Sequence, residues 1–342
     1  MRASLTQPLP ERERHAMTVE EIAAALAGLA PRLAAGATGI AGLTLLTGGA
    51  SMQTWAFDAT GPDGATALIL RRRGQAVASG EQLCLGAEAA LIRAAGAAGA
   101  PVPGVVLVSD VDEALGEAIV VGRLAGETLG QRIVRSPAFA PARSLLPAQC
   151  GAALAAIHAI PPGTVAGLPA RNAAETLAFY QRAWVRDPLP RATIAAAFRR
   201  LAGTVPAPVT PRLLHGDFRT GNLMVDPDRG LVGVLDWELA HLGDPAEDIG
   251  WLTVNSWRFG GAGEAGGFGG LDPLFAAYSA AGGAPVSAQR VRWWGAMGSL
   301  KWAVMTRTMY LAGGGGVERA VIGRRLSECE ADLAAWLGSA DE

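Results

Sequence analysis

Lysine is nearly absent from this sequence of 342 residues: the basic residues are almost all arginines, and Lys301 is the only lysine. We attribute this, with the abundance of alanine and glycine, to the coding bias of a GC-rich genome. Cysteine is scarce as well, since Cys84, Cys150 and Cys329 lie far apart and form neither a CxxC pair nor a Cys/His cluster. Isolated thiols of this kind are typical of buried, unpaired cysteines in a reducing compartment, so we expect a cytoplasmic protein.

The sequence also lacks a strong excess of one charge and any long apolar run. A formal net charge of -2 gives no electrostatic reason to expect nucleic acid or an anionic membrane as the main partner. The most apolar early stretch, residues 22–46, is interrupted by Pro31, Arg32 and several glycines, so it is too broken to cross a bilayer. Residues 1–17 carry charges where a signal peptide needs an apolar core, and we expect a flexible tail without secretion.

The first third of the chain has the pattern of a sheet. Thr18, followed three positions later by Glu21, predicts a capping box that opens a helix. Apolar runs at 43–59 and 65–73 flank the sequence GPDG, a strong turn signal, and therefore predict a pair of strands.

The remainder of the chain has mostly helical patterns after Gly126. Half of all residues are hydrophobic, which is typical of a globular protein, and the length allows about two domains or lobes. A strand-rich start followed by a helical remainder predicts an α+β fold with an N-terminal lobe over residues 18–124 and a C-terminal lobe over residues 125–342.

The most specific chemical pattern lies in the predicted C-terminal lobe. The run His-Gly-Asp at 215–217 follows an apolar lead-in, and Asn222 comes five positions after the aspartate. A short apolar stretch, a turn at 226–230 and a second apolar stretch then lead to Asp236. Two strands joined by this turn would bring Asn222 and Asp236 to the same end of a hairpin.

This set of side chains suits the transfer of a phosphoryl group to a hydroxyl. Such a reaction needs a carboxylate that orients and deprotonates the acceptor, and oxygen ligands that hold magnesium against the phosphates. Asp217 suits the first role, whereas Asn222 and Asp236 suit the second. Aspartates near turns are commonly only turn formers or caps, and this is how we interpret Asp226, Asp228 and Asp244.

The run HGDxxxxN followed by an LDW-type aspartate resembles the aminoglycoside phosphotransferase family, whose other members resemble choline and homoserine kinases. The sequence around this motif resembles one branch of the family in particular, the phosphotransferases encoded beside or fused to acyl-CoA dehydrogenases. The resemblance lies in the segment WELAHLGDPAEDIGWL and in the later segments GSLKWAVMTRTMY and IGRR. The likeness covers nearly the whole chain. It implies a protein-kinase-like two-lobed fold, with a β-rich nucleotide-binding N-lobe and a helical C-lobe that binds substrate, and a small-molecule kinase that uses ATP and Mg²⁺ on a hydroxyl group.

The resemblance also implies roles for two further residues of the C-lobe. The acidic residue equivalent to Asp248 braces the catalytic loop in this fold more often than it touches substrate. His215 likewise resembles a structural scaffold of the loop and not a base.

In the N-lobe, the resemblance implies a set of nucleotide-binding residues. The segment LTGGASMQTWAF matches a turn in which Gly48 and Gly49 permit close backbone approach and Ser51 adds a hydroxyl. Arg71 stands where the family commonly has lysine, and arginine can still bind phosphate through two nitrogens. Glu88 matches the acid that pairs with this basic residue.

Residues 118–123 resemble the hinge whose backbone groups bind adenine, which makes Val121 and Arg123 the predicted contacts. The arginine at the lysine position leaves a second hypothesis open, a catalytically weak nucleotide-binding partner of acyl-CoA enzymes. The complete set at 217, 222 and 236 favours catalysis, because a retired site has no chemical need for all three.

Other patterns carry no function of their own. The glycines at 261, 263 and 266 satisfy the dinucleotide pattern but follow no convincing strand, so we expect a flexible loop near the substrate side. The absence of GxSxG, HExxH and GxxxxGK[ST] removes the hydrolase, zinc-protease and Walker-type interpretations. The many tryptophans between 251 and 302 predict an aromatic wall, mostly core, with one or two members lining a pocket.

The candidate substrate lobe carries five cations among its acids: Arg258, Arg290, Arg292, Lys301 and Arg307. Aminoglycosides are polycations, and their kinases need an acidic acceptor site. We therefore expect an anionic or acyl-type hydroxylated substrate, such as a hydroxy acid or a hydroxyacyl-CoA. A kinase of the choline or aminoglycoside type stays as an alternative, for which the sequence offers part of an aromatic and acidic pocket.

Overall fold

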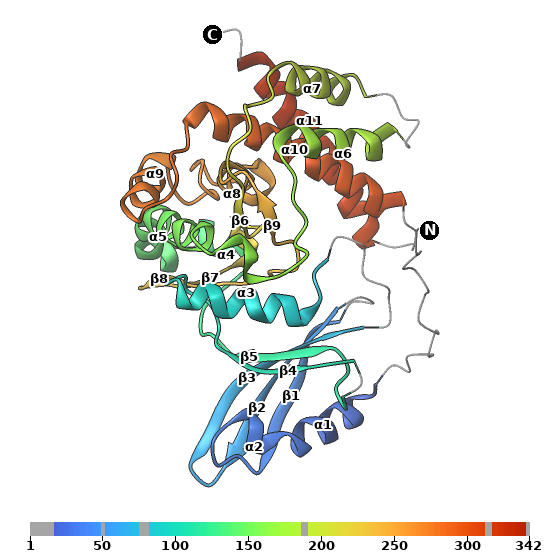
Figure 1. The fold of residues 1–342 in the computed structure, drawn as a ribbon, viewed down its shortest axis with the longest axis vertical. Coiled ribbons are helices and arrows are strands. Elements are labelled where there is room, and N and C mark those ends of the chain that lie inside the picture. The colour runs from blue at the N-terminus through green and yellow to red at the C-terminus, as the bar shows by residue number, and fades with distance from the viewer. Residues whose placement is uncertain are drawn as a thin grey trace, which may run out of the picture. The chain divides into compact units, whose positions relative to one another are not determined.

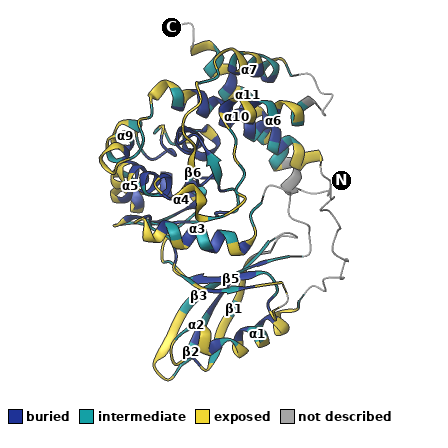
Figure 2. Ribbon diagram, viewed as in Figure 1, coloured by how far each residue is buried: buried dark blue, intermediate teal, exposed yellow. Residues whose placement is uncertain are grey.

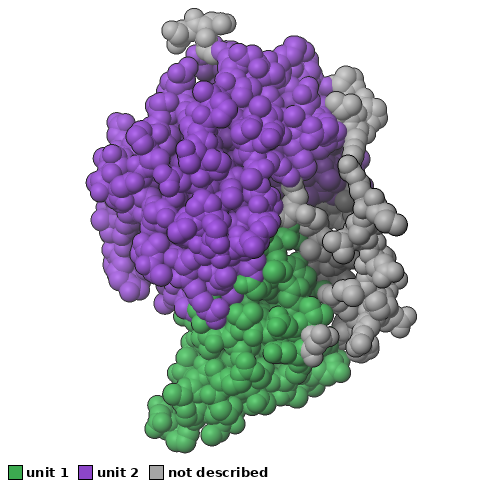
Figure 3. All heavy atoms as spheres, viewed as in Figure 1, with its two compact units in different colours: residues 1–86, 105–123 green, residues 87–104, 124–342 purple. Residues whose placement is uncertain are grey.

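The computed structural model of the protein describes residues 17–48, 52–74, 82–111, 113–185, 191–311 and 317–339. The chain divides into two compact units, coloured in Figure 3, which are residues 1–86 with 105–123 and residues 87–104 with 124–342. This division differs from the predicted lobes in segment 87–104. One contact that ties it to the second unit is the hydrogen bond from the N–H of Val234 to the carbonyl of Pro101 (2.8 Å). Apart from Met17, the predicted tail lies outside the described residues.

The first unit contains a five-stranded antiparallel sheet with the strand order β1-β2-β3-β5-β4 and two short helices (Figure 1). Its elements are α1 (Val19–Gly28), α2 (Ala30–Leu33), β1 (Gly39–Gly48), β2 (Met52–Gly61), β3 (Gly64–Arg73), β4 (Val105–Ser109) and β5 (Ala118–Gly122). β2 and β3 pair from Met52 opposite Arg73 to Gly61 opposite Gly64, so the predicted strands and the turn between them are confirmed.

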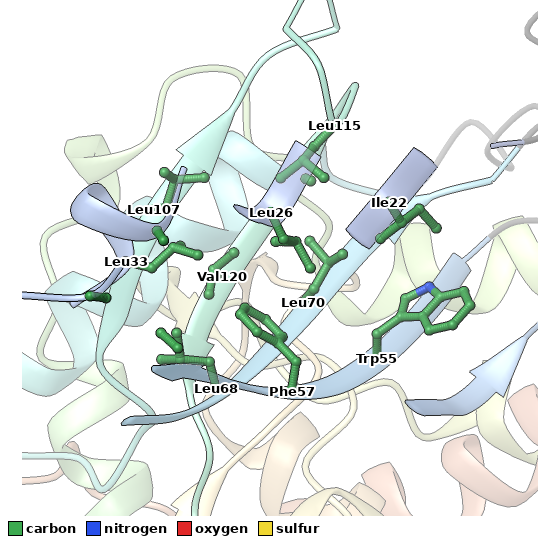
Figure 4. Close-up of a cluster of buried hydrophobic side chains, with 14 residues drawn as sticks. Ile22, Leu26, Leu33, Trp55, Phe57, Leu68, Leu70, Leu107, Leu115 and Val120 are labelled. Atoms are coloured by element: carbon green, nitrogen blue, oxygen red, sulfur yellow. The ribbon is translucent and has the colours of Figure 1, made fainter. Parts of the chain in front are cut away.

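The helix α1 covers the sheet with one apolar side. It begins at the predicted capping box, in which Thr18 Oγ1 accepts from the N–H of Glu21 (3.2 Å) and the Glu21 carboxylate accepts from the N–H of Thr18 (2.7 Å). Ile22 and Leu26, one turn apart, pack into a cluster of buried side chains that includes Phe57 (Figure 4). Burial of each such side chain stabilises the fold by about 1.5–3 kcal/mol.

The second unit is mainly helical and contains two small antiparallel sheets, one of β6 with β9 and one of β7 with β8 (Figure 1). Its elements are α3 (Leu85–Ala97, which begins in the first unit), α4 (Gly130–Arg135), η1 (Pro137–Phe139), α5 (Ala140–His158), η2 (Pro162–Thr164), α6 (Ala173–Val185), α7 (Ala192–Gly203), β6 (Arg212–Leu214), η3 (Thr220–Asn222), β7 (Leu223–Asp226), β8 (Gly230–Val234), β9 (His241–Gly243), α8 (Ala246–Leu252), η4 (Asn255–Trp257), α9 (Leu271–Ala280), α10 (Ala288–Leu311) and α11 (Val317–Gly338). The predicted change from a strand-rich start to a helical remainder is confirmed.

Close helix packing forms the interior of this unit. α5 packs against α9, and α10 packs against both α8 and α11. α5 and α9 each have a buried and an exposed side (Figure 2). Gly151 allows α5 to approach α9, because a Cβ at this position would lie 2.2 Å from the carbonyl oxygen of Leu274. The short α8 is buried along its whole length, and it therefore lies at the centre of this unit's core.

The prediction of buried cysteines is confirmed in part. Cys150 and Cys329 are buried as predicted, whereas Cys84 is exposed. Burial raises the pKa of Cys329 to about 12 and raises that of Cys150 further. Within the described residues, no helix combines the length and the apolar character that crossing a membrane requires.

Candidate active site

The loop from His215 to Asn222 follows β6 and is held by α8. The chain turns at Gly216, which has a φ of 79° and lies so close to the carbonyl oxygen of Leu239 that a Cβ would be 2.1 Å away. Only glycine fits this position. The carboxylate of Asp248 accepts hydrogen bonds from the N–H groups of His215 (2.8 Å) and Gly216 (2.9 Å), and so fixes the backbone at the start of the loop.

Asp248 is itself anchored from two other helices. Its Oδ2 contacts His158 Nε2 on α5 (3.2 Å), and the Nδ1 of the same ring contacts the hydroxyl of Tyr278 on α9 (2.9 Å). With 1% of its side chain exposed, Asp248 would have a raised pKa from burial alone, but the hydrogen bond and charge of His158 and the N–H of His215 lower its pKa to about 2. Asp248 is therefore ionised near neutral pH and braces the loop.

The ring of His215 forms hydrogen bonds with backbone groups. Its Nδ1 accepts from the N–H of Asp217 (3.2 Å), so Nε2 carries the proton that is donated to the carbonyl of Leu235 (3.0 Å). Burial lowers the pKa of His215, and its ring packs edge-on against Phe218 and Trp237. The neutral ring thus links the loop to the residue before Asp236.

Asp217 is the point on which side chains of this loop and of α8 converge. Arg219 Nε donates to both carboxylate oxygens (3.1 Å each), Trp251 Nε1 donates to Oδ1 (2.7 Å), and Asn222 Nδ2 donates to Oδ2 (2.7 Å). Asn222 Nδ2 also donates to the backbone carbonyl of Asp217 (3.0 Å). The carboxylate is therefore fixed in orientation, and it keeps lone pairs that can accept the proton of a bound hydroxyl.

Asn222 and Asp236 lie at the same end of the β7–β8 hairpin, as the spacing suggested. Leu223 pairs with Val234, and the N–H of Leu235 donates to the carbonyl of Asn222 (2.9 Å). Asp236 follows with a φ of 67°, a conformation that is uncommon outside glycine and that recurs at functional sites. The structure thus brings Asn222 to Asp217 and to the hairpin end that carries Asp236.

The oxygens of this hairpin end fit a divalent cation that is also bound by phosphates. Since the amide nitrogen of Asn222 is used on Asp217, its Oδ1 is the side-chain oxygen that could bind a metal, at the hairpin end that also carries Asp236. Within the described ranges, no group of three or more His, Cys, Asp or Glu side chains could form a closed metal cage. Mg²⁺ commonly takes one or two protein oxygens and completes its shell with water and phosphate oxygens.

The predicted nucleotide-binding residues belong mostly to the first unit. Gly48 is the last residue of β1, while Gly49 and Ser51 lie outside the described residues. Arg71 lies on β3, paired with Ile119 of β5, and it is on the strand face opposite the buried core. The contacts of these residues with phosphate remain predictions.

The two arginines after Arg71 have structural contacts and are not simply solvated. Arg72 is buried and donates to Gln53 (2.9 Å) and to the carbonyl of Leu115 (3.3 Å). Arg73 forms an ion pair with Glu117 (2.9 Å), whose other oxygen accepts from the N–H at the start of α3. Arg71 and Arg73 alternate with the buried Arg72, so both lie on the outer face of the strand, where Arg73 is paired with Glu117.

The other predicted nucleotide residues have different surroundings. Glu88 is buried in α3, within the second unit. Val121 is buried in β5 and pairs with both neighbouring strands. Arg123 donates its N–H to Ala67 (3.0 Å) and its guanidinium to Asp58 (2.6 Å), so an adenine contact at this position would have to use its carbonyl oxygen.

Several cationic side chains that the sequence suggested for binding the substrate instead form hydrogen bonds or ion pairs within the second unit. Arg258 donates twice to the carbonyl of Thr253, and Arg290 forms an ion pair with Asp244 (2.6 Å). Arg292 is exposed on α10. Of the cations that motivated the expectation of an anionic acceptor, Arg258 and Arg290 thus form bonds within the second unit.

Lys301 lies beneath the catalytic loop. Only 8% of it is exposed, its Nζ donates to the carbonyl of Gly216 (3.3 Å), and it lies 4.6 Å from the centre of the Trp251 ring. Burial alone would lower the pKa of Lys301, but the charges of Tyr180, Glu247 and other acids raise it. A protonated Lys301 thus supports both the loop and the tryptophan that binds Asp217.

Arg219 and Trp251 are the site residues that sequence reasoning missed. Arg219 is two positions from Asp217, and its guanidinium lies 4.8 Å from the ring centre of Trp257. That ring packs against Trp251 (5.2 Å) and Trp302 (4.8 Å). The predicted aromatic wall exists, but nothing in the sequence indicated that one of its members donates to the carboxylate of Asp217.

The glycine run at 261–270 is packed against the catalytic loop. Thr220 Oγ1 donates to the carbonyl of Gly266 (2.9 Å), and the N–H of Gly266 donates to Leu252 (3.1 Å). Residues 265–268 are buried. The expected flexible loop is instead a hydrogen-bonded turn, because its backbone groups find partners within the second unit.

Comparisons with known proteins agree with this geometry. The family described as "Phosphotransferase enzyme family" matches residues 42–294. A Ralstonia eutropha protein assigned to the aminoglycoside phosphotransferases superposes with a TM-score of 0.70 and 17% identity, covering 94% of this chain and 98% of that one. The amicoumacin kinase hAmiN, solved with AMP-PNP, Ca²⁺ and Ami, superposes with a TM-score of 0.57 and 14% identity, covering 85% of this chain and 88% of that one. These likenesses confirm the predicted α+β, protein-kinase-like fold.

A curated relative matches a short part of the chain. Acyl-CoA dehydrogenase family member 10 of Mus musculus is 46% identical over 43 residues, which are 12% of this chain. The matched part spans 4% of that relative's length.

Proposed function

Because this chain belongs to the phosphotransferase enzyme family and is a small-molecule kinase acting on hydroxyl groups, we propose that it uses ATP with Mg²⁺ to phosphorylate a hydroxy acid or its CoA thioester. The observation that carries this proposal is the contact between Asp217 and Asn222 (2.7 Å) at the hairpin end with Asp236. It supports a base and metal-binding oxygens in one place, which is the arrangement that phosphoryl transfer to a hydroxyl requires.

In the proposed reaction, Asp217 accepts the hydrogen of the acceptor hydroxyl and orients its oxygen. The oxygen forms a bond to the γ-phosphorus, the bond from that phosphorus to the oxygen shared with the β-phosphate breaks, the proton passes to Asp217, and ADP leaves. A bound Mg²⁺, held by Asn222 Oδ1 and Asp236, would neutralise the charge on the phosphates. Arg71 and the segment 48–51 are proposed to hold the phosphates from the first unit.

The surroundings of the loop favour an acceptor that is not a polycation. The buried acids near it are already matched by basic groups: Asp248 by His158, and Glu247 by His241 (3.4 Å). The charged side chain that contacts the Asp217 carboxylate is the cation of Arg219. An amine-rich acceptor would meet this positive charge, whereas a carboxyl group would be attracted to it.

The partial match to an acyl-CoA dehydrogenase relative supports the CoA thioester as one form of the acceptor. On this proposal the kinase acts in the same pathway as an acyl-CoA dehydrogenase. Phosphorylation would prepare the acyl chain for a later step, because it turns the hydroxyl into a better leaving group.

The experiment is an assay of ADP formation with hydroxy acids, their CoA thioesters and aminoglycosides, with the phosphorylated product identified by mass. Asp217→Ala should lower turnover by about 10²–10⁴-fold, since base and positioner are lost together. Asp228→Ala, an exposed turn residue, is the matched control and should keep full activity. ADP formation by wild type that stays at the background level of Asp217→Ala with every acceptor would favour the non-catalytic hypothesis, and turnover of aminoglycosides alone would reject the proposed acceptor.

A further inference from the structure

Arg219 has an arrangement that bonding to Asp217 alone does not explain. Within the described residues, every hydrogen bond of its side chain uses Nε, which donates to the two oxygens of Asp217. The terminal nitrogens Nη1 and Nη2 take part in neither of these hydrogen bonds, and 25% of the side chain is exposed. Arginine has five N–H donors in a fixed plane, so this geometry leaves most of them for another ligand.

The guanidinium is held in place by two neighbours. Its Cζ lies over the ring of Trp257, 4.8 Å from the ring centre. Gly221 lies close to Nη1, because a Cβ at that position would be 2.4 Å from this nitrogen. A side chain fixed in this way loses little further freedom when it binds a ligand.

We infer that Arg219 is the specificity-determining residue of the acceptor site, and that its terminal nitrogens bind a carboxyl-derived oxygen of the same molecule whose hydroxyl binds Asp217. The inference rests on the proposed function, and it adds the residue that reads the acceptor. The oxygen belongs either to a free carboxylate or to a thioester carbonyl, both of which accept hydrogen bonds in the plane of a guanidinium.

The reach of the guanidinium limits the distance between the two groups. A hydrogen bond of about 2.8 Å on each side of Arg219, together with the width of the guanidinium, places the bound oxygen up to roughly 8 Å from Asp217. The hydroxyl that binds Asp217 occupies about 2.7 Å of that span. The acceptor therefore carries its hydroxyl a few bonds from its carboxyl carbon, and the distant phosphates of a CoA thioester are not what Arg219 reads.

The test compares three acceptors of equal chain length: a hydroxy acid, its CoA thioester, and the alcohol in which a methyl group replaces the carboxyl group. In the wild type, kcat/KM for the acid or the thioester should exceed that for this alcohol by about 10²-fold, because a site built to bind an oxygen rejects the analogue without it. Arg219→Met should lower turnover of all three and reduce this preference to a few-fold. The acceptor that loses most identifies whether carboxylate or thioester is bound.

Two further variants separate specificity from structure. Arg219→Lys keeps the charge but cannot donate to Asp217 and to the acceptor from one plane, so its preference should be intermediate. Arg199→Gln removes an exposed arginine of α7 in the same unit and should leave the preference unchanged. Retention of the full wild-type preference by Arg219→Met would overturn the inference, as would a wild type that uses the alcohol without a carboxyl group equally well.

Binding without turnover provides an independent measurement. Calorimetry with the hydroxy acid or thioester, in the absence of nucleotide, should show affinity about tenfold weaker or more for Arg219→Met, with little change for the alcohol without a carboxyl group. If no acceptor yields ADP but this difference is found, the kinase proposal fails and the role of Arg219 in binding stands. If ADP forms but the affinities and the preference do not depend on Arg219, the kinase proposal stands and this inference fails.

Discussion

Replacement of Asp248 should show how strongly the fold constrains the catalytic loop. In Asp248→Ala, three buried donors lose their acceptor: the N–H groups of His215 and Gly216, and Nε2 of His158. A buried donor left without a partner costs about 1–3 kcal/mol. Because these contributions overlap, we expect a total loss of about 3–5 kcal/mol in the free energy of unfolding.

The pH dependence of the free energy of unfolding shows whether Asp248 stabilises the fold at acid or at neutral pH. The folded-state pKa of Asp248, about 2, lies below its usual value of 3.8. Its contribution is therefore fully present above about pH 4, and it is lost as the pH falls toward 2, because the unfolded chain binds the proton first. A shift of this size corresponds to about 2 kcal/mol.

The assay is urea unfolding followed by tryptophan fluorescence at several pH values between 2 and 7. Wild type should lose stability in the acid part of this range more steeply than Asp248→Asn, which has no carboxylate to titrate. The amide of this variant would keep one acceptor oxygen but turn its hydrogens toward a donor, so the variant should also be less stable than wild type at pH 7. Asp228→Asn is the control and should follow wild type. The reasoning is refuted if Asp248→Asn equals wild type at pH 7, or if both show the same acid dependence.

Three further substitutions test the contacts around Asp217. Trp251→Phe removes the Nε1–H donor (2.7 Å) but keeps an aromatic ring, and kcat should fall about 10–100-fold with the KM for ATP little changed, in steady-state assays. Lys301→Met should lower kcat about tenfold, and mass spectrometry should find Lys301 unlabelled by an amine reagent in native wild type but labelled in urea, since it is 8% exposed. Gly216→Ala should cost about 2 kcal/mol or more in urea unfolding, because of its φ of 79° and the Leu239 carbonyl, whereas Gly86→Ala, with nothing within 4 Å, should not destabilise.

Local features of the fold were the most predictable from sequence. The capping box at Thr18, the turn between β2 and β3 and the β7–β8 hairpin depend on residues a few positions apart, and each is present. The spacing of Asn222 and Asp236 was informative for the same reason, because a hairpin converts separation along the chain into proximity at its open end.

Contacts between distant segments could not be predicted in this way. Trp251 reaches Asp217 across 34 positions, and Lys301 reaches Gly216 across 85. A tryptophan or a lysine on a helix has the same sequence appearance whether it fills the core or supports a catalytic loop, so periodicity alone cannot distinguish the two. The same limit explains Arg258 and Arg290, whose charges were visible in the sequence while their buried partners were not.

The helix α8 explains why the loop and its catalytic carboxylate are positioned together. Asp248 and Trp251 are three residues apart on this helix, and residues with this spacing lie on the same side of a helix. Asp248 binds the backbone at the start of the loop, and Trp251 binds the Asp217 side chain, so one short buried element fixes both. A shift of α8 would therefore move the backbone and the carboxylate in concert. Substitutions that loosen α8 against α10, where a Cβ at Gly250 would lie 2.6 Å from the Cβ of Trp294, should for this reason reduce turnover even though they touch neither Asp217 nor an acceptor.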